Sequence, residues 1–141
     1  MEQATILYIE DNFHNRRIAR KILQSRGYTM VEAEDGIKGL EMVTSLKPAL
    51  VLLDIGLPGM DGLEVVARIK ADEELKHIPV IALTASAMRG DRERFLAAGC
   101  DDYLSKPVQV NELLDKVGEY LQVGAVREPP PPPYFRNGET A

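Results

Sequence analysis

The chain has 141 residues, of which 45% are hydrophobic and 28% charged, and its formal net charge is −5. This length and composition are typical of one soluble globular domain, and the negative charge argues against binding to nucleic acid. No apolar run approaches the roughly 18 residues that span a bilayer. A single cysteine, Cys100, excludes an internal disulfide and fits the reducing cytoplasm. Together these features lead us to expect a cytoplasmic protein that binds neither membrane nor nucleic acid.

The beginning of the chain predicts one strand and one helix. Residues 4–9 form a continuous apolar run, which is typical of a strand buried on both faces. Asn12 is a suitable N-cap for the helix that follows, and Gly27 is a suitable residue to end it. Apolar residues recur near helical spacing at Phe13, Ile18, Ile22 and Leu23. The basic residues of this helix are expected to face solvent, and they are Arg16, Arg17, Arg20 and Lys21.

The same alternation continues through the middle of the chain. Residues 28–33 predict a second strand, and Asp35 is a suitable N-cap for a second helix. Residues 50–53 form a third apolar run, which stops at Asp54. A loop rich in glycine and proline follows, and a third helix is expected to begin at Asp61, which is well placed to cap it.

The second half of the chain repeats this order twice more. Residues 80–83 predict a fourth buried strand, which ends at Thr84 and is followed by a helix. Residues 102–105 predict a short fifth strand that ends at Lys106. Asn111 is expected to cap the last amphipathic helix.

Five strands in strict alternation with five helices predict an α/β fold with helices on both faces of a parallel sheet. The doubly wound arrangement of five such strands has the order 2-1-3-4-5. The pattern stops near residue 124, and residues 129–133 are all proline, a run that stays extended and cannot join a core. We therefore expect a domain over residues 1–123 and a Pro-rich tail or linker over 124–141.

Polar residues stand at the ends of four of the predicted strands. Glu10 and Asp11 follow the first strand, Asp54 ends the third, Thr84 the fourth and Lys106 the fifth. The carboxyl ends of parallel strands share one crevice in this strand order. Carboxylates brought together there repel by about 4 kcal/mol per pair at a separation near 4 Å, and a hard divalent cation such as Mg²⁺ relieves that cost.

These residue types suit the metal-assisted transfer of a phosphoryl group onto Asp54. A carboxylate can act as the nucleophile, while Lys106 supplies a positive charge and Thr84 a hydroxyl for the phosphate oxygens. Taken singly, each has a plain structural explanation. Thr84 could fill a strand end, Lys106 could be solvated, and Glu10 and Asp11 could favour the helix dipole.

Four motifs at the strand ends resemble the receiver domain of two-component response regulators. They are Glu10-Asp11-Asn12, the run from Leu53 to Gly62, Leu83-Thr84-Ala85 and Ser105-Lys106-Pro107. The match covers residues 5 to about 122 in order, and residues 83–108 look most like receivers of hybrid sensor kinases and of stand-alone regulators. The resemblance implies a flavodoxin-like fold and a role in a phosphorelay.

The resemblance also implies a role for each residue of the acidic crevice. Asp54 matches the aspartate that is phosphorylated. Glu10 and Asp11 match the acidic pair that, with Asp54, holds Mg²⁺, for which Mn²⁺ can substitute. Gly56 matches the position whose backbone carbonyl completes the metal site.

The remaining matches concern the response to phosphorylation. Thr84 and Lys106 match the residues that contact the phosphoryl group. Tyr103, three residues before Lys106, matches the aromatic residue that turns inward on activation, although a half-buried strand aromatic is the commoner role. The peptide bond between Lys106 and Pro107 is expected to be cis, which is otherwise found in only about 5–6% of such bonds.

Partners follow from the same resemblance. The phosphoryl donor would be a sensor histidine kinase or a histidine phosphotransfer protein, and a downstream protein would bind the surface of the fourth helix, fifth strand and fifth helix. The protein would be a switch, not an enzyme, that catalyses only its own phosphorylation and dephosphorylation. Lys116 stands where many transcription-factor receivers have a dimerisation arginine, so we expect a monomer or weak dimer.

Two other functions fit part of the pattern. A Mg²⁺-dependent phosphatase with an aspartyl-phosphate intermediate needs a general acid two residues after its nucleophile, where Gly56 cannot donate a proton. A flavin-binding protein of the flavodoxin type needs a small, hydroxyl-rich loop after the first strand, whereas the loop at Glu10 and Asp11 is acidic.

Overall fold

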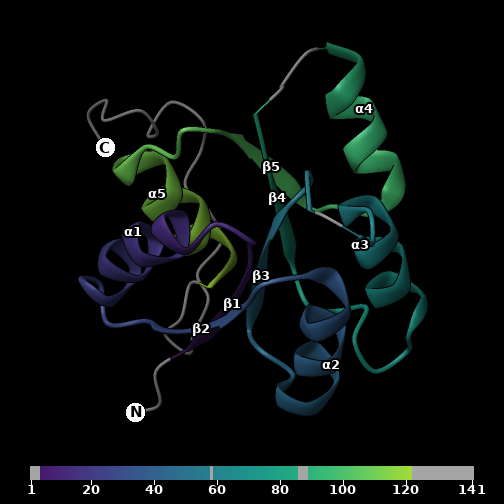
Figure 1. Cartoon of the computed structure of the whole chain (residues 1–141), viewed down its shortest axis with the longest axis horizontal. Helices are drawn as coiled ribbons and strands as arrows, with labels where there is room; N and C mark the ends of the chain where they lie inside the picture. Colours follow the sequence, from purple (N-terminus) through teal and green to yellow (C-terminus); the bar gives the residue numbers. More distant parts are fainter. Residues whose placement is uncertain (1–3, 58, 86–88, 122–141) are drawn as a thin grey trace.

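The computed structural model describes residues 4–57, 59–85 and 89–121, and the expected tail over 124–141 lies outside these ranges. Strands and helices alternate along the described chain (Figure 1). The strands are β1 (Thr5–Ile9), β2 (Thr29–Ala33), β3 (Leu50–Asp54), β4 (Val80–Thr84) and β5 (Asp102–Ser105). The helices are α1 (Phe13–Gln24), α2 (Gly36–Leu46), α3 (Gly62–Ala71), α4 (Arg89–Ala98) and α5 (Val110–Tyr120). None of these helices has the length and apolarity that a membrane crossing requires.

The strands form one parallel sheet in the order β2-β1-β3-β4-β5, which confirms the predicted order 2-1-3-4-5 and the flavodoxin-like fold. The register pairs Ile9 with Leu53 and Asp54 with Leu83. The carboxyl ends of β1 and β3 are therefore level with each other, and residues that follow them emerge at the same edge of the sheet.

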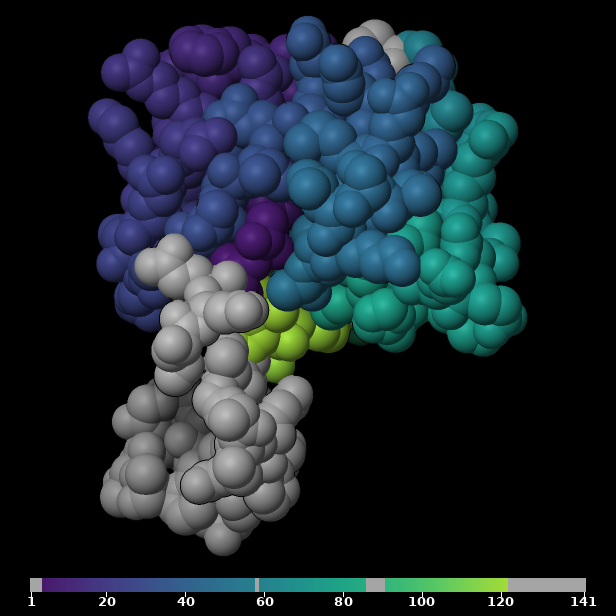
Figure 2. All heavy atoms as spheres, turned by 90° about the horizontal axis from the view of Figure 1, so that it is seen from below, coloured from purple at the N-terminus to yellow at the C-terminus, as the bar shows by residue number. Residues whose placement is uncertain are grey.

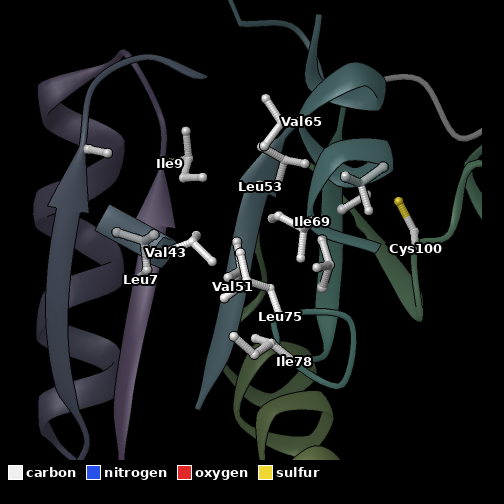
Figure 3. Packing of buried hydrophobic residues seen from close by; sticks show 14 of the residues in the cluster. Leu7, Ile9, Val43, Val51, Leu53, Val65, Ile69, Leu75, Ile78 and Cys100 are labelled. Atoms are coloured by element: carbon white, nitrogen blue, oxygen red, sulfur yellow. The ribbon is translucent and has the colours of Figure 1, made fainter. Parts of the chain in front are cut away.

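The two faces of the sheet carry two separate cores, because successive side chains of a strand point to opposite faces. Helices α2, α3 and α4 cover one face, and α1 and α5 cover the other (Figure 1). Figure 3 shows the first core, where Leu7, Ile9, Val51 and Leu53 face α2 and α3 and Cys100 is buried at the rim. Each large side chain buried in this way contributes about 1.5–3 kcal/mol.

The amino ends of the strands lie at the end of the molecule opposite to their carboxyl ends. In Figure 2 the purple start of the described chain lies there between blue segments and the yellow-green end of α5. A shallow groove of about 430 Å³ between the amino ends of the strands is lined partly by Thr5, Thr29 and Lys47. The groove is therefore separated by the length of the sheet from the polar residues at the carboxyl ends.

Three of the predicted helix caps are confirmed. The side chains of Asn12, Asp35 and Asp61 each accept a hydrogen bond from a backbone N–H in the first turn of α1, α2 and α3, at 2.8, 2.7 and 2.9 Å. Caps of this kind contribute about 1 kcal/mol each. They place the start of each helix directly after a strand end or its loop.

The predicted cap at Asn111 is wrong. Helix α5 begins at Val110, its N-cap is Gln109, and that residue makes no side-chain capping bond. The N–H of Leu113 donates to the Gln109 carbonyl at 2.9 Å, so helical hydrogen bonding starts two residues before Asn111. Asn111 is therefore inside the first turn.

The prediction that the basic residues of α1 all face solvent is wrong for two of them. Nε of Arg16 lies 2.8 Å from Oε1 of Glu32, and Nε of Arg20 donates to Oε2 of the same residue at 2.8 Å. Glu32 lies on β2, the edge strand beside α1, so its carboxylate draws both guanidinium groups inward. Conversely, Phe13 is 64% exposed although its spacing suggested a core position.

Candidate functional site

Three carboxylates meet at the carboxyl ends of β1 and β3. Glu10, Asp11 and Asp54 each offer an oxygen within 4.8 Å of the other two. Glu10 is only 1% exposed and Asp54 6% exposed, whereas Asp11 is open to solvent. Because burial and mutual repulsion both disfavour charged carboxylates, this cluster requires positive charge or hydrogen-bond donors nearby.

Lys106 supplies positive charge to the two buried carboxylates. Its Nζ lies 3.0 Å from Oε1 of Glu10 and 3.3 Å from Oδ1 of Asp54. The side chain enters the cluster from the end of β5, and the peptide bond that joins Lys106 to Pro107 is cis. Burial lowers the pKa of this amine, but its contacts with Glu10 and Asp54 outweigh burial and raise the pKa above its ordinary value.

Glu10 is the most enclosed member of the cluster. The hydroxyl of Tyr8 donates to its Oε1 at 2.9 Å, and the N–H of Asn12 donates to its Oε2 at 3.2 Å. Burial by itself raises the pKa of the Glu10 carboxyl, but the bonds from Lys106, Asn12 and Tyr8 hold that pKa below its ordinary value. Glu10 is therefore a fixed negative charge at neutral pH.

Asp54 is held through one of its two oxygens. Its Oδ1 accepts the N–H of Gly56 at 3.0 Å as well as the contact from Lys106. Burial raises the pKa of this carboxyl and the charge of Glu10 raises it further, against the opposing effects of Gly56 and Lys106. Oδ2 accepts no hydrogen bond from the residues that the structure describes, so it is the oxygen best placed to react.

Thr84 and Tyr103 lie on β4 and β5, the two strands beyond Asp54 in the sheet. Thr84 is buried at the end of β4, and its carbonyl accepts the N–H of Lys106 at 2.8 Å. Tyr103 is half-buried on β5, with its ring centroid 6.4 Å from that of Phe95 in α4. The two predicted switch residues thus lie on neighbouring strands, next to the strand end that carries Lys106.

Sequence reasoning missed three residues that support this site. The first is Tyr8, which the apolar run concealed, although its position two residues before Glu10 puts both side chains on one face of the extended chain. The second is Arg16, whose Nη1 donates to the backbone carbonyl of Glu10 at 2.8 Å. Its partner Glu32 is distant in sequence, so local spacing gave no indication of either contact.

The third missed residue is Gly62, the first residue of α3. A Cβ atom there would lie 2.8 Å from Cα of Ile55 and 2.9 Å from the carbonyl oxygen of Asp54. The chain that leaves Asp54 packs directly against the start of α3, and only glycine permits this approach. Gly62 therefore sets the path of the backbone at the reactive carboxylate.

An apolar hollow of about 420 Å³ lies beside the carboxylate cluster, on the α1 and α5 side of the sheet. Tyr8 and Lys106 line it, together with Ile18 of α1 and Pro107 after β5. The two residues that contact Oε1 of Glu10 therefore also form the wall between the cluster and this hollow.

The arrangement can hold a hard cation and bind a phosphoryl group. Carboxylate and carbonyl oxygens are the ligands that Mg²⁺ prefers, and Glu10, Asp11 and Asp54 offer three such oxygens at one point. A partly buried amine beside a carboxylate nucleophile can neutralise the oxygens of a phosphoryl group. The chemistry that fits is phosphoryl transfer onto Asp54.

Comparison with known proteins identifies the family of the chain. The model of the response regulator receiver domain matches residues 6–118. The polar-differentiation response regulator DivK of Brucella anthropi is 40% identical over 117 residues, which cover 83% of this chain and 95% of that protein. DivK of Brucella ovis is 41% identical with the same coverage.

Solved structures of receiver domains resemble this chain as well. One is the receiver domain of a sensor histidine kinase from Pseudomonas aeruginosa, which has a magnesium ion coordinated in its active-site cleft. Its TM-score is 0.79 and its sequence identity is 35%, and the alignment covers 86% of this chain and 100% of that receiver domain. A CheY-like receiver domain protein from Methanospirillum hungatei has a TM-score of 0.79 and 29% identity, with coverage of 86% and 95%.

Proposed function

The chain belongs to the response regulator receiver domain family, whose members are signalling switches, and from this premise we propose that Asp54 accepts a phosphoryl group. The donor is the phosphohistidine of a sensor histidine kinase or of a histidine phosphotransfer protein. The observation that carries the proposal is the setting of Asp54, whose Oδ1 is fixed by Gly56 and Lys106 while Oδ2 accepts no hydrogen bond from the described residues.

The carboxylate cluster fits the Mg²⁺ ion that this transfer requires. Glu10, Asp11 and Asp54 would hold the ion, and the backbone carbonyl of Gly56 would complete the set with another hard oxygen. Mn²⁺ prefers the same ligands and can take the same place. When bound, the ion supplies positive charge against the oxygens of the transferring phosphoryl group. The magnesium ion in the related receiver from Pseudomonas aeruginosa supports this assignment.

The transfer of the phosphoryl group needs no further reactant. An oxygen of Asp54 attacks the phosphorus atom, the P–N bond to the donor imidazole breaks, and the imidazole nitrogen keeps the bonding electron pair. The product on Asp54 is an acyl phosphate. Lys106, already 3.3 Å from the carboxylate, neutralises part of the charge on the transferred oxygens. Hydrolysis of the acyl phosphate returns the switch to its starting state.

The new charge on Asp54 changes the positions of its neighbours. Lys106 and the hydroxyl of Thr84 move toward the phosphoryl oxygens, and Tyr103 turns into the space behind Thr84. The surface of α4, β5 and α5 then changes shape for a downstream protein. Shifting such a switch from 1:99 to 99:1 takes about 5.5 kcal/mol of differential stabilisation.

Other properties of the chain agree with a small signalling protein that acts through protein contacts. Nζ of Lys116 lies 3.0 Å from Oδ2 of Asp102 in the same chain. Many transcription-factor receivers dimerise through an arginine at the position of Lys116. Because the Lys116 amine is paired within its own chain, we expect a monomer or weak dimer. We propose that the receiver spans residues 1–123 and that residues 124–141 are a Pro-rich tail. We also propose that the protein acts in the cytoplasm and binds neither nucleic acid nor membrane.

Incubation with radiolabelled acetyl phosphate tests the proposed function. We expect label on the wild-type protein with Mg²⁺, little without Mg²⁺, and none on Asp54→Asn, which keeps the shape of the side chain but not its nucleophilic oxygen. Asp61→Asn, which alters a helix cap outside the cluster, is the control and should be labelled like the wild type. Label that persists on Asp54→Asn would refute the assignment of the acceptor.

A further inference from the structure

Tyr8 places a hydroxyl group inside the sheet, directly behind the carboxylate cluster. The residue lies on β1 and is 2% exposed, and its ring packs in the core between the sheet, α1 and α5. Its hydroxyl donates to Oε1 of Glu10 at 2.9 Å. A buried tyrosine hydroxyl needs such a partner, but the ring packing by itself would be met equally well by phenylalanine.

The hydrogen bonds of Glu10 leave little freedom for a cation. A carboxylate has about four lone-pair directions, two on each oxygen. Oε1 receives both Tyr8 and Lys106, and Oε2 receives the N–H of Asn12. Among the contacts of the described residues, the direction that stays open is therefore on Oε2.

We propose that Tyr8 is a positioning residue for the cation site. By occupying Oε1 of Glu10, its hydroxyl turns the remaining lone pair of Oε2 toward the cation. This inference rests on the proposed function, because it concerns the same cluster of Glu10, Asp11 and Asp54. Tyr8 does not touch the cation and acts only through Glu10.

Tyr8 has a role that Lys106 cannot fulfil. In the proposed switch Lys106 moves from the carboxylates to the phosphoryl oxygens, so its contact with Oε1 of Glu10 is weakened when the site is phosphorylated. Tyr8 is fixed by its packing in the core and keeps its hydrogen bond to Glu10. The orientation of Glu10 is thereby held through the whole cycle.

The variant Tyr8→Phe removes the hydroxyl and keeps the ring. We expect the dissociation constant for Mg²⁺, measured by isothermal titration calorimetry, to rise about tenfold, because loss of a residue that orients a metal ligand typically weakens metal binding by 10- to 100-fold. Labelling from acetyl phosphate should need correspondingly more Mg²⁺ for half its maximal rate. At saturating Mg²⁺ the rate should return to within about twofold of the wild type.

Tyr120→Phe is the matched control. Tyr120 lies on α5, and its hydroxyl also contacts a carboxylate, Oδ2 of Asp102, at 3.2 Å. This contact lies outside the carboxylate cluster. We expect the Mg²⁺ affinity of Tyr120→Phe to equal that of the wild type, and urea unfolding checks that both variants are folded. A change in Mg²⁺ affinity that is equal in both variants would overturn the proposal, since it would reflect general loosening.

A second background tests whether Tyr8 acts through Glu10. In the Glu10→Gln variant, Tyr8→Phe should cause no further loss of Mg²⁺ affinity, whereas independent and multiplicative losses would contradict the proposal. An unchanged affinity in the single variant Tyr8→Phe would contradict it as well. If Tyr8→Phe is unchanged while Asp54 is still labelled, only the role of Tyr8 fails. If the wild-type protein neither binds Mg²⁺ nor becomes labelled, the proposed function fails with it.

Discussion

Lys106 and Asp54 are in contact across an intervening strand. Nζ of Lys106 lies 3.3 Å from Oδ1 of Asp54, although β5 and β3 are separated in the sheet by β4. The same amine also lies 3.0 Å from Oε1 of Glu10, the residue that follows β1. Lys106 therefore links the ends of three strands and serves as the counterion of two buried carboxylates when no cation is bound.

The first prediction concerns that counterion. Lys106→Ala should lower the free energy of unfolding by about 3 kcal/mol in metal-free buffer, because it leaves buried negative charges unpaired. Mg²⁺ should restore more stability to this variant than to the wild type, since the ion replaces the missing charge. Urea unfolding with and without Mg²⁺ measures both effects.

A lysine in an exposed ion pair provides the control. Lys47 pairs with Glu74 at 3.0 Å, and both side chains are largely solvated, so Lys47→Ala should change stability by less than about 1 kcal/mol. If Lys106→Ala were equally mild, or if Mg²⁺ stabilised it no more than the wild type, Lys106 would not be the counterion of the cluster.

The second prediction concerns the glycine at the start of α3. Gly62→Ala should destabilise the protein by about 1–3 kcal/mol and slow labelling of Asp54, because its Cβ would clash with the backbone of Ile55 and Asp54. Gly118→Ala on α5 meets nothing within 4 Å and should stabilise the helix by about 0.5–1 kcal/mol. Thermal unfolding and labelling rates measured on both variants check this contrast. Equal behaviour of the two would refute the close approach at Gly62.

Local sequence patterns were sufficient for the sheet and for most of its connections. The apolar runs that become β1 and β3 and the caps at Asn12 and Asp35 depend on neighbouring residues alone, and the structure agrees with them. The meeting of Glu10 with Asp54 also followed from the sequence, because the strand order places the ends of β1 and β3 together.

Features that depend on contacts distant in sequence could not be predicted in this way. Arg16 faces inward because Glu32 lies on the adjacent edge strand, 16 residues away. Tyr8 looked like any apolar strand residue, since only the folded register shows that its hydroxyl meets Glu10. Asn111 has the side chain of a cap, but helix α5 starts before it.

The third prediction concerns pH and the link between α1 and β2. Burial raises the pKa of Glu32, but the bonds from Arg20 and Arg16 outweigh it and lower that pKa below its ordinary value of 4.5. A lowered folded-state pKa stabilises the protein above the ordinary pKa, and this stabilisation is lost as the pH falls through the folded value. Glu32→Gln should therefore cost about 1 kcal/mol at pH 7.

The difference between Glu32→Gln and the wild type should shrink as the pH falls below 4.5, because the wild-type carboxyl becomes protonated and loses its charge. Urea unfolding across this pH range measures it. Glu64→Gln, which breaks an exposed pair with Arg68 within α3, is the control and should show almost no difference at any pH. A constant difference for Glu32→Gln would contradict an electrostatic role of the two arginines.

The position of the phosphoryl group is the most direct test of the central claim. Treatment of the phosphorylated protein with borohydride converts an aspartyl phosphate to homoserine, and peptide mapping by mass spectrometry then locates the residue. With acetyl phosphate and Mg²⁺, we predict conversion at Asp54 and at no other acidic residue. Conversion at Glu10, Asp11 or elsewhere, with Asp54 unchanged, would contradict the account.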